Sequence, residues 1–373
     1  MYEVFGDYVI EPHVLDAAIR KWIEGVTSIV ALRGAISGFG EVAAQAHLVG
    51  WRARPDVNIV AIHDPVSARR HRAMNLIKNV RVYDDLELML DGEALDFLDI
   101  ASPPEFHAAS ARMALEADAH VLVEKPLCLD AAEFAGLTAL ATEKSRVLMC
   151  VHNWKYSPAY RRAYELVSHG HLGMVRYLSL VRLRGEPAGA EGMSAGGGER
   201  WRLDARTGGG ILIDHGWHVF YLIHWLMGGV APSGVSANLD ASLGATVDDL
   251  AFIWAEFPDG RLAYSHLSWR APARRTSAVL YGDKAMLEVE GNRVLLTERS
   301  GAAHDYSVSD APDDSYHAGW FAGVAAHFEQ ALRDGPSSPL VRENQAEAQT
   351  ALMLMLGARK SSTSGGIAVK IAI

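Results

Sequence analysis

The sequence predicts an α/β protein in which a doubly wound parallel sheet is followed by an α+β domain with a mostly antiparallel sheet. Between residues 30 and 152, nearly continuously apolar strands alternate with helices, as in a parallel sheet covered on both faces. After residue 153, strand-like runs follow one another across tight turns such as PDG and GNR, as in an antiparallel sheet. We therefore expect an N-terminal extension (1–29), a first domain (30–152) and a second domain (153–373).

In the first domain, the expected strands and helices alternate along the chain. In order they are strand LRGAIS, glycine turn and helix GFGEVAAQAHLVGW, strand VNIVAIHD, helix VSARRHRAMNLI, a short VRVY, helix DLELML, strand LDFLDIA, helix EFHAASARMALEA, strand HVLVEKP, helix AAEFAGLTALAT and strand VLMCV.

The second domain begins with the helix AYRRAYELVSHG and the strand VRYLSLVRLR, followed by the glycine-rich loop GEPAGAEGMSAGGGER. An apolar helix, GGGILIDHGWHVFYLIHWLMG, comes next. The remaining expected elements are the strands LAFIWAEF, RLAYSHLSW, SAVLYG, AMLEVE and VLLT, the helices WFAGVAAHFEQAL and NQAEAQTALMLMLGAR, and a terminal IAVKIAI.

The composition favours a cytoplasmic enzyme. The chain has 373 residues, of which 49% are hydrophobic, and its formal net charge of −10 argues against nucleic acid or an anionic membrane as the main partner. No stretch reaches the roughly 18 to 20 uninterrupted apolar residues of a membrane span, and the first residues show no export signal. The two cysteines, Cys128 and Cys150, fit a reducing compartment.

The first turn, GFGEVA, has the spacing of a dinucleotide site, because it follows a predicted strand and opens a helix. Glycines allow a tight turn and close approach of the backbone to a pyrophosphate, which the helix N-terminus attracts. An ordinary turn is the alternative. The residues expected at the cofactor are Gly38, Phe39, Gly40, Glu41 and Val42.

Asp64 ends the second strand, where a carboxylate can bind a ribose 2′-hydroxyl. This favours NAD, although Arg69 and Arg70 follow closely and keep NADP as an alternative. The fourth strand ends in residues 101–107, ASPPEFH. Ligands gather at the carboxyl ends of parallel strands, so we expect Ala101, Ser102 and Pro103 beside the nicotinamide. His107 is either a cofactor contact or a packing residue.

The chain resembles the glucose–fructose oxidoreductase / inositol dehydrogenase / MocA family. The resemblance is carried by GFGEVA, ASPPEFHAASARMALEADAHVLVEKPL, NWKYSPAYR, GGGILIDHGWH and FPDGRLAYSHLSW, and it extends from about residue 32 to 360. It implies a Rossmann domain followed by an open-faced sheet that forms a homodimer or homotetramer. It also implies NAD(P)-dependent oxidation or reduction of a sugar, polyol or related hydroxyl compound, and often a cis bond before Pro126.

By this resemblance, Lys125 corresponds to the catalytic lysine, and Asp214 and His218 to an Asp-x-x-x-His pair. Glu124, Lys125 and Asn153 are then expected near the cofactor, and Lys155, in the segment after the sixth strand, near the substrate. Asp214 and His218 are four residues apart on a predicted helix, so the carboxylate could orient the imidazole and favour its charged form. His218 would take the hydroxyl proton, while Lys125 stabilises alkoxide charge.

Other residues have two interpretations. Tyr156, Trp201 and Arg202 could line the substrate pocket or hold the loop, and His215 could contact substrate or only support the site. A metal site of Asp214, His215 and His218 is disfavoured, because no fourth ligand is evident.

Two other functions remain for the same fold. One is cleavage of glycosides by an enzyme that retains NAD, and the other is a non-catalytic sensor of nucleotide or sugar.

Overall fold

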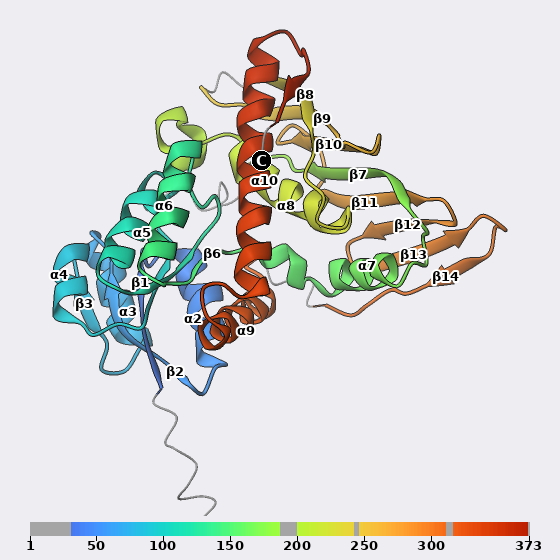
Figure 1. Ribbon diagram of the computed structural model, residues 1–373. Helices are drawn as coiled ribbons and strands as arrows, with labels where there is room; N and C mark the ends of the chain where they lie inside the picture. The colour runs from blue at the N-terminus through green and yellow to red at the C-terminus, as the bar shows by residue number, and fades with distance from the viewer. Residues whose placement is uncertain (1–30, 187–199, 242–245, 311–315, 372–373) are drawn as a thin grey trace, which may run out of the picture.

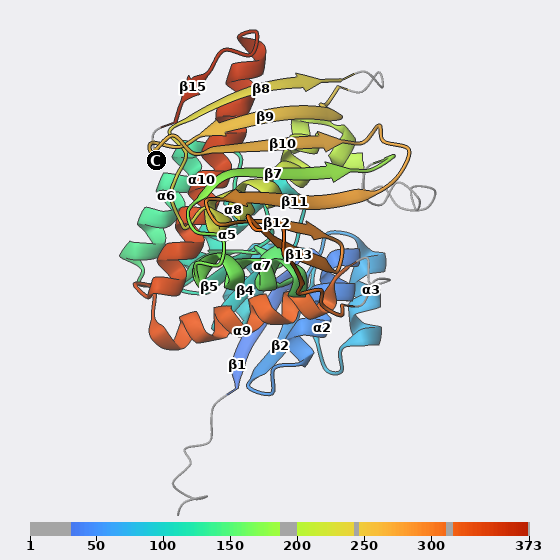
Figure 2. The same ribbon diagram turned by 90° about the vertical axis from the view of Figure 1, so that its right-hand side faces the viewer.

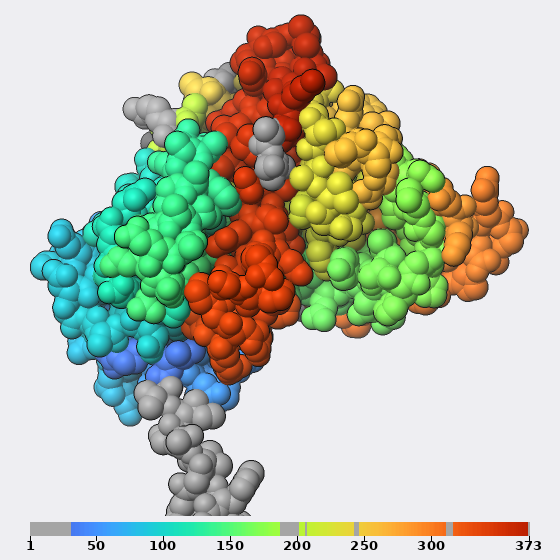
Figure 3. All heavy atoms as spheres, in the orientation of Figure 1, coloured from blue at the N-terminus to red at the C-terminus, as the bar shows by residue number. Residues whose placement is uncertain are grey.

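The computed structural model describes residues 31–186, 200–241, 246–310 and 316–371. Two lobes lie on either side of the long helix α10 (Pro339–Thr363), which runs between them (Figure 1). In the space-filling view, α10 fills the surface between the blue-green N-terminal lobe and the yellow-orange C-terminal lobe (Figure 3). The expected N-terminal extension and most of the glycine-rich loop lie outside the described residues.

The first lobe is built on a parallel sheet with the strand order β3-β2-β1-β4-β5-β6. Its strands are β1 (Leu32–Ser37), β2 (Val57–His63), β3 (Arg81–Tyr83), β4 (Phe97–Ile100), β5 (His120–Val123) and β6 (Leu148–Cys150). The connecting helices are η1 (Ala43–His47), α2 (Leu48–Arg52), α3 (Ser67–Leu76), α4 (Leu86–Gly92), η2 (Pro104–Phe106), α5 (His107–Glu116) and α6 (Ala131–Glu143). The doubly wound sheet that the sequence predicts is thereby confirmed.

The second lobe holds a nine-stranded sheet, ordered β14-β13-β12-β11-β7-β10-β9-β8-β15. Its strands are β7 (Val175–Leu183), β8 (Gly234–Asp240), β9 (Leu250–Glu256), β10 (Leu262–Ser268), β11 (Arg275–Gly282), β12 (Ala285–Glu290), β13 (Arg293–Glu298), β14 (Ala303–Asp305) and β15 (Val369–Lys370). All neighbouring pairs are antiparallel except β7 and β10. The predicted, mostly antiparallel sheet is therefore confirmed.

Helices cover one face of this sheet. Figure 2 is viewed from the opposite face, which these helices leave open. The helical segments of this lobe are η3 (Asn153–Tyr156), α7 (Pro158–Ser168), η5 (Arg200–Leu203), η6 (Ala205–Thr207), η7 (Leu212–Gly216) and α8 (Trp217–Leu226). Of these, α7, η7 and α8 contact strands of the sheet. Helix α10 contacts β6 and α6 on one side and α8 and β8 on the other. It therefore joins the two lobes.

Helix α9 (Ala318–Asp334) comes from the C-terminal part of the chain but packs against η1 and α2 of the first lobe. Phe328 meets the rings of Trp51 and Phe97 edge-on, at centroid distances of 6.2 and 5.6 Å. Phe321 stacks on His47 at 3.9 Å. Burying such aromatic rings contributes about 1.5–3 kcal/mol each, so a distant segment completes the core of the Rossmann lobe. No helix within the described ranges is long and apolar enough to cross a membrane.

Candidate active site

Lys125 lies just beyond β5, before a cis peptide bond to Pro126, and its side chain reaches the second lobe. The ammonium Nζ donates to the main-chain oxygen of Asp214 at 2.7 Å and lies 3.4 Å from the carboxylate Oδ1 of the same residue. The parallel sheet places the lysine at its carboxyl edge, and η7 carries the aspartate. This contact brings together two of the predicted catalytic residues across the lobes.

The carboxylate of Asp214 is buried and surrounded by cationic and imidazole groups. Arg202 donates from Nε to Oδ1 at 3.2 Å, and Nδ1 of His215 lies 3.2 Å from Oδ2. Burial raises the pKa of Asp214, but the charges of Arg202 and Lys125 outweigh burial and hold that pKa well below its usual range. Asp214 is therefore an ionised carboxylate. We call Lys125, Arg202, Asp214, His215 and His218 the Lys125 cluster.

His218 is buried and neutral. Burial, with the nearby charge of Lys125, lowers the pKa of its imidazole well below the usual value. The ring stacks on Trp154 at a centroid distance of 4.7 Å, and Nδ1 is 3.0 Å from the hydroxyl of Tyr221. Because the Tyr221 oxygen also accepts from the Trp154 N–H at 3.0 Å, the imidazole is held on two sides.

This arrangement corrects the expected pairing of Asp214 with a charged His218. Asp214 lies in the π-helical turn η7, whereas His218 lies in α8, so the spacing of one regular α-helix does not apply across the junction. The described contacts of the carboxylate go to Lys125, Arg202 and His215, and His218 turns to Tyr221 instead. Burial also lowers the pKa of His215 well below its usual value, so neither imidazole is charged.

The glycines before η7 shape the approach to this cluster. Gly208 and Gly210 have φ angles of +83° and +110°, which favour glycine. A Cβ at Gly210 would lie 2.4 Å from Oδ1 of Asp248, which accepts from the Leu212 N–H through its other oxygen. These glycines therefore allow the backbone to bend sharply just before η7.

The glycine turn has the shape that a dinucleotide requires. Gly38 has a φ of +87°, and a Cβ there would lie 2.6 Å from the backbone of Ser102. By contrast, a Cβ at Gly40 would meet no atom of the described ranges within 4 Å, so the backbone is open to a pyrophosphate on that side. Asp64 is buried and accepts from the N–H groups of Phe39 and Val66, both at 2.8 Å. It thus joins the turn to the end of β2.

Two further polar atoms support a cofactor beside the Lys125 cluster. The Ser102 hydroxyl and the Asn153 side-chain oxygen are buried and lack a hydrogen-bond partner among the described residues. A bound ligand would satisfy both atoms. Ala101 and Pro103 flank Ser102 and are half-buried, and Val42 is exposed on the helix after the turn.

Other predicted cofactor residues are engaged within the protein. Glu41 forms an ion pair with Arg72. His107 is buried, with its ring nitrogens 2.6 Å from the Pro126 oxygen and 2.8 Å from the Ser102 oxygen. We therefore assign His107 to packing between the ends of β4 and β5. Glu124 accepts from its neighbour's backbone, the Lys125 N–H, at 2.9 Å.

The predicted substrate residues separate into two groups. Arg202 and His215 belong to the Lys125 cluster, and Trp201 lies under the Arg202 guanidinium, 4.4 Å from ring centroid to Cζ. By contrast, Lys155 is ion-paired with the buried Glu347 of α10, and the Tyr156 hydroxyl is 2.7 Å from His327 of α9. These two side chains hold helices in place because their polar groups are already used there.

Three residues near the site escaped the sequence analysis. His47 lies between Asp99 and Glu124, Arg182 lies on β7 beside Trp154, and Glu347 accepts from His152 at 2.9 Å. Each is an ionisable residue within an apolar or amphipathic run, which is the signal that could have identified it.

No group of three or more His, Cys, Asp or Glu residues in the described part of the chain is arranged to hold a metal ion.

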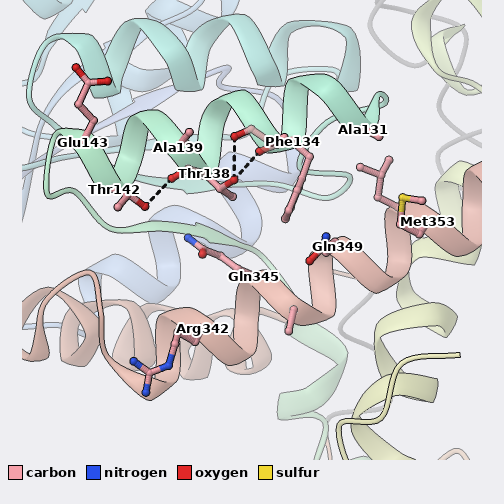
Figure 4. Close-up of a pocket in the computed structure, with 13 residues that line it drawn as sticks. Ala131, Phe134, Thr138, Ala139, Thr142, Glu143, Arg342, Gln345, Gln349 and Met353 are labelled. Carbon is pink, nitrogen blue, oxygen red and sulfur yellow. Dashed lines mark hydrogen bonds between the residues drawn. The ribbon is translucent and has the colours of Figure 1, made fainter. Parts of the chain in front are cut away.

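A groove between α6 and α10 contains no member of the Lys125 cluster (Figure 4). The hydroxyls of Thr138 and Thr142 on its α6 side donate to carbonyls of their own helix. These two hydroxyls are therefore already used within α6.

Comparisons with known proteins agree with this architecture. A family described as "Oxidoreductase family, NAD-binding Rossmann fold" matches residues 32–152, and a "GFO/IDH/MocA C-terminal domain" matches residues 160–288. D-glucoside 3-dehydrogenase of Escherichia coli K12 is 26% identical over 304 residues, which cover 77% of this chain and 84% of that protein. D-apiose dehydrogenase of Paraburkholderia graminis is 31% identical over 148 residues, 39% of each chain.

Among solved structures, an inositol dehydrogenase homologue from Azotobacter vinelandii in complex with NAD⁺ aligns with a TM-score of 0.76 and 20% identity. The alignment covers 91% of this chain and 97% of that one. An oxidoreductase from Agrobacterium radiobacter, in complex with NAD⁺, L-tartaric acid and magnesium, aligns with a TM-score of 0.80 and 17% identity over 91% and 98% of the two chains. These similarities concern the fold.

Proposed function

The chain belongs to the Gfo/Idh/MocA family of NAD-binding oxidoreductases, and on that premise we propose that it transfers a hydride between nicotinamide and a secondary hydroxyl or keto group of a sugar, polyol or related compound. The observation that carries the proposal is the Lys125 cluster, in which a lysine from one lobe meets a buried carboxylate beside a neutral histidine from the other. Named relatives are dehydrogenases and reductases, which favours neither glycoside cleavage nor a sensor.

The roles of the residues follow from their contacts. Lys125 has three N–H donors, and its two contacts to Asp214 leave one for the substrate oxygen. Ionised Asp214 offsets part of the combined positive charge of Lys125 and Arg202 and holds the ammonium at the place where alkoxide charge would develop. When bound, NAD supplies the hydride acceptor, or in its reduced form the donor.

His218 is the proposed proton acceptor in the oxidative direction. Its imidazole is neutral and can therefore bind a proton without first losing one. If Nδ1–H donates to the Tyr221 oxygen, Nε2 carries the free lone pair that faces away from that bond. Tyr221 and the stacked Trp154 then orient the base.

We propose NAD rather than NADP as the cofactor. The support is Asp64, whose buried carboxylate lies at the end of β2 beside the glycine turn and would repel a 2′-phosphate. Arg69 lies 3.5 Å from that carboxylate and partly offsets its charge.

A homodimer or homotetramer through the open face of the nine-stranded sheet is proposed as the assembly. Aromatic pairs occupy this face, including Trp254 with Tyr264 and Tyr177 with Tyr281, whose ring centroids are 4.4 and 5.5 Å apart. Trp254 and Tyr281 are each 44% exposed, and exposed apolar patches are typical of protein–protein interfaces. Both cysteines are buried free thiols, which supports the proposal of a reducing, cytoplasmic compartment.

The test is a turnover assay of the purified protein with NAD or NADP and a panel of sugars, sugar acids, polyols and glycosides. We expect NADH to form with at least one compound, with NAD preferred. Nucleotide binding without reduction of the nicotinamide on any compound would contradict the proposal and favour a sensor. Release of free sugar without NADH would favour glycoside cleavage.

A further inference from the structure

Arg182 lies near the carboxyl end of β7, on the face of the nine-stranded sheet that the helices cover. It is paired with Leu267 of β10 and Thr276 of β11, and residues paired across a sheet share a face. The preceding residues on the same face, Leu178 and Leu180, are buried core residues. An arginine thus continues an apolar row toward the Lys125 cluster.

The guanidinium of Arg182 is almost fully buried and incompletely paired. Arg182 as a whole is only 5% exposed, and its Nε has no hydrogen-bond partner within the described parts of the chain. Nη1 donates to the Thr276 hydroxyl, and Cζ lies 5.1 Å from the ring centroid of Trp154. A buried charge without an anionic partner is strongly unfavourable, so this guanidinium is suited to a partner that arrives with the ligand.

Arg182 is close to the reacting centre, because Trp154 contacts it and also stacks on His218. The surroundings are positive: burial, together with the charges of Arg274 and Arg184, lowers the pKa of Arg182 to about 9, although Tyr160 and Asp214 act in the opposite direction. Asp214 is already shared by Lys125 and Arg202.

Other buried polar atoms that have no hydrogen-bond partner among the described residues lie near the same end of the sheet. They are Ser265 Oγ and Trp269 Nε1 on the β10 segment and Nδ1 of His215, whose ring meets Trp269 edge-on at 6.3 Å. Ser265, Leu267 and Trp269 are spaced two residues apart, so their side chains point to the same face of the sheet. Leu267 is paired with Arg182, so this is also the face of Arg182. The inner face therefore presents one buried guanidinium together with neutral polar groups, among which the Trp269 indole N–H is a donor without a partner in the described residues.

We propose that Arg182 is a specificity-determining residue that binds an anionic group, a carboxylate or a phosphate, on the substrate whose carbinol lies at Lys125. A planar guanidinium suits both anions, and the indole N–H of Trp269 can supply a further donor. The substrate is then an acidic sugar derivative rather than a neutral sugar. This inference rests on the proposed hydride transfer.

The test uses matched probes on the NAD-loaded protein: glucose, galactose and mannose, each as the free sugar, the uronate and the 6-phosphate. Calorimetry measures binding, and NADH formation measures kcat and KM. We expect at least one acidic probe to bind about tenfold to a hundredfold more tightly than its neutral parent, the range of a charge-assisted hydrogen bond. The uronate and phosphate arms identify which anion is preferred.

Arg182→Gln should remove that preference, mainly by raising KM, and should change neutral probes by less than about threefold. Arg182→Lys retains the positive charge but not the two parallel N–H donors of the guanidinium, so it should lose only part of the preference for the acidic probe. It serves as the second variant if Arg182→Gln folds poorly. Arg176→Gln, an exposed arginine on the same strand, is the matched control and should leave all values unchanged.

Acidic probes that bind no more tightly than neutral ones, or an equal loss for both classes in Arg182→Gln, would overturn the anion site. Turnover of neutral sugars alone would contradict the anion site and leave hydride transfer standing. Tight binding of an acidic probe without NADH formation would contradict hydride transfer and leave the anion site standing.

Discussion

The imidazole of His47 lies 3.1 Å from the carboxylate of Glu124, the residue immediately before Lys125. The other ring nitrogen lies 2.9 Å from the buried carboxylate of Asp99, which also accepts from the Trp51 indole. Burial alone would lower the pKa of His47, but the two carboxylates outweigh it and raise the pKa to about 9. A buried imidazolium therefore ties the helix after the glycine turn to the strand end that carries Lys125.

This imidazolium predicts a pH-dependent stability. Because the pKa of His47 is raised on folding, its contribution is fully present below the unfolded value of 6.5 and is lost as pH rises through about 9. At 1.36 kcal/mol per pKa unit the contribution is about 3 kcal/mol. We expect His47→Gln to lower the unfolding free energy at pH 6 and to flatten its decline between pH 7 and about 10.

Denaturant unfolding across this pH range measures the effect. His71→Gln, at an exposed histidine on α3, is the control and should reproduce the wild-type curve. A parallel alkaline decline in wild type and His47→Gln would show that His47 is not the titrating group.

The neutral state of His218 predicts how catalysis responds to pH. A base whose pKa is lowered well below 6.5 binds a solution proton only under more acidic conditions, so it stays competent as pH falls from about 8 to 6. Loss of a general base costs about a hundredfold to ten-thousandfold in rate, which we expect for kcat of His218→Gln.

Comparing the two kcat profiles isolates the histidine. The ratio of wild-type to His218→Gln kcat should remain constant between about pH 6 and pH 8. A ratio that falls toward one below pH 7 would mean that the imidazole titrates in that range, contrary to its buried position.

Asp64 predicts the choice of nucleotide. Asp64→Asn keeps the shape of the side chain, and its remaining oxygen can still accept from the Phe39 N–H, but the charge that repels a 2′-phosphate is gone. We expect the ratio of kcat/KM for NAD over NADP to fall about tenfold or more. Asp84→Asn, an exposed carboxylate near Arg70, should not change it. An unchanged ratio in Asp64→Asn would remove Asp64 from cofactor selection.

The sequence predicted the parts of the fold that depend on local patterns. Apolar strands alternating with helices fixed the Rossmann sheet, and the glycine spacing located a turn whose geometry at Gly38 and Gly40 matches the expectation. Lys125 and Asp214 were identified as catalytic residues by the family resemblance, and both are charged groups at the end of an apolar strand or inside an apolar helix, where an ionisable side chain requires a reason.

Long-range packing was beyond such patterns. Nothing in the α9 sequence indicates that Phe321 and Phe328 pack in the first lobe, because amphipathic spacing shows an apolar face but not its partner. Lys155 and Tyr156 were expected at the substrate for the same reason, although Glu347 and His327, more than 170 residues away, take their polar groups. Arg182 could not be identified as a residue near the site without knowing which face of β7 is covered by helices.

The central claim is that the Lys125 ammonium, held against Asp214 across the two lobes, stabilises developing charge on the substrate oxygen during hydride transfer. The most direct measurement is single-turnover NADH formation by Lys125→Met with saturating NAD and substrate, beside calorimetric NAD affinity. Lys144→Met, which removes a surface ion pair with Asp118, is the control. We predict a loss of about a hundredfold to a thousandfold in the hydride-transfer rate, the cost of one oxyanion donor, with NAD affinity nearly unchanged. A Lys125→Met rate within a few-fold of wild type would contradict the account.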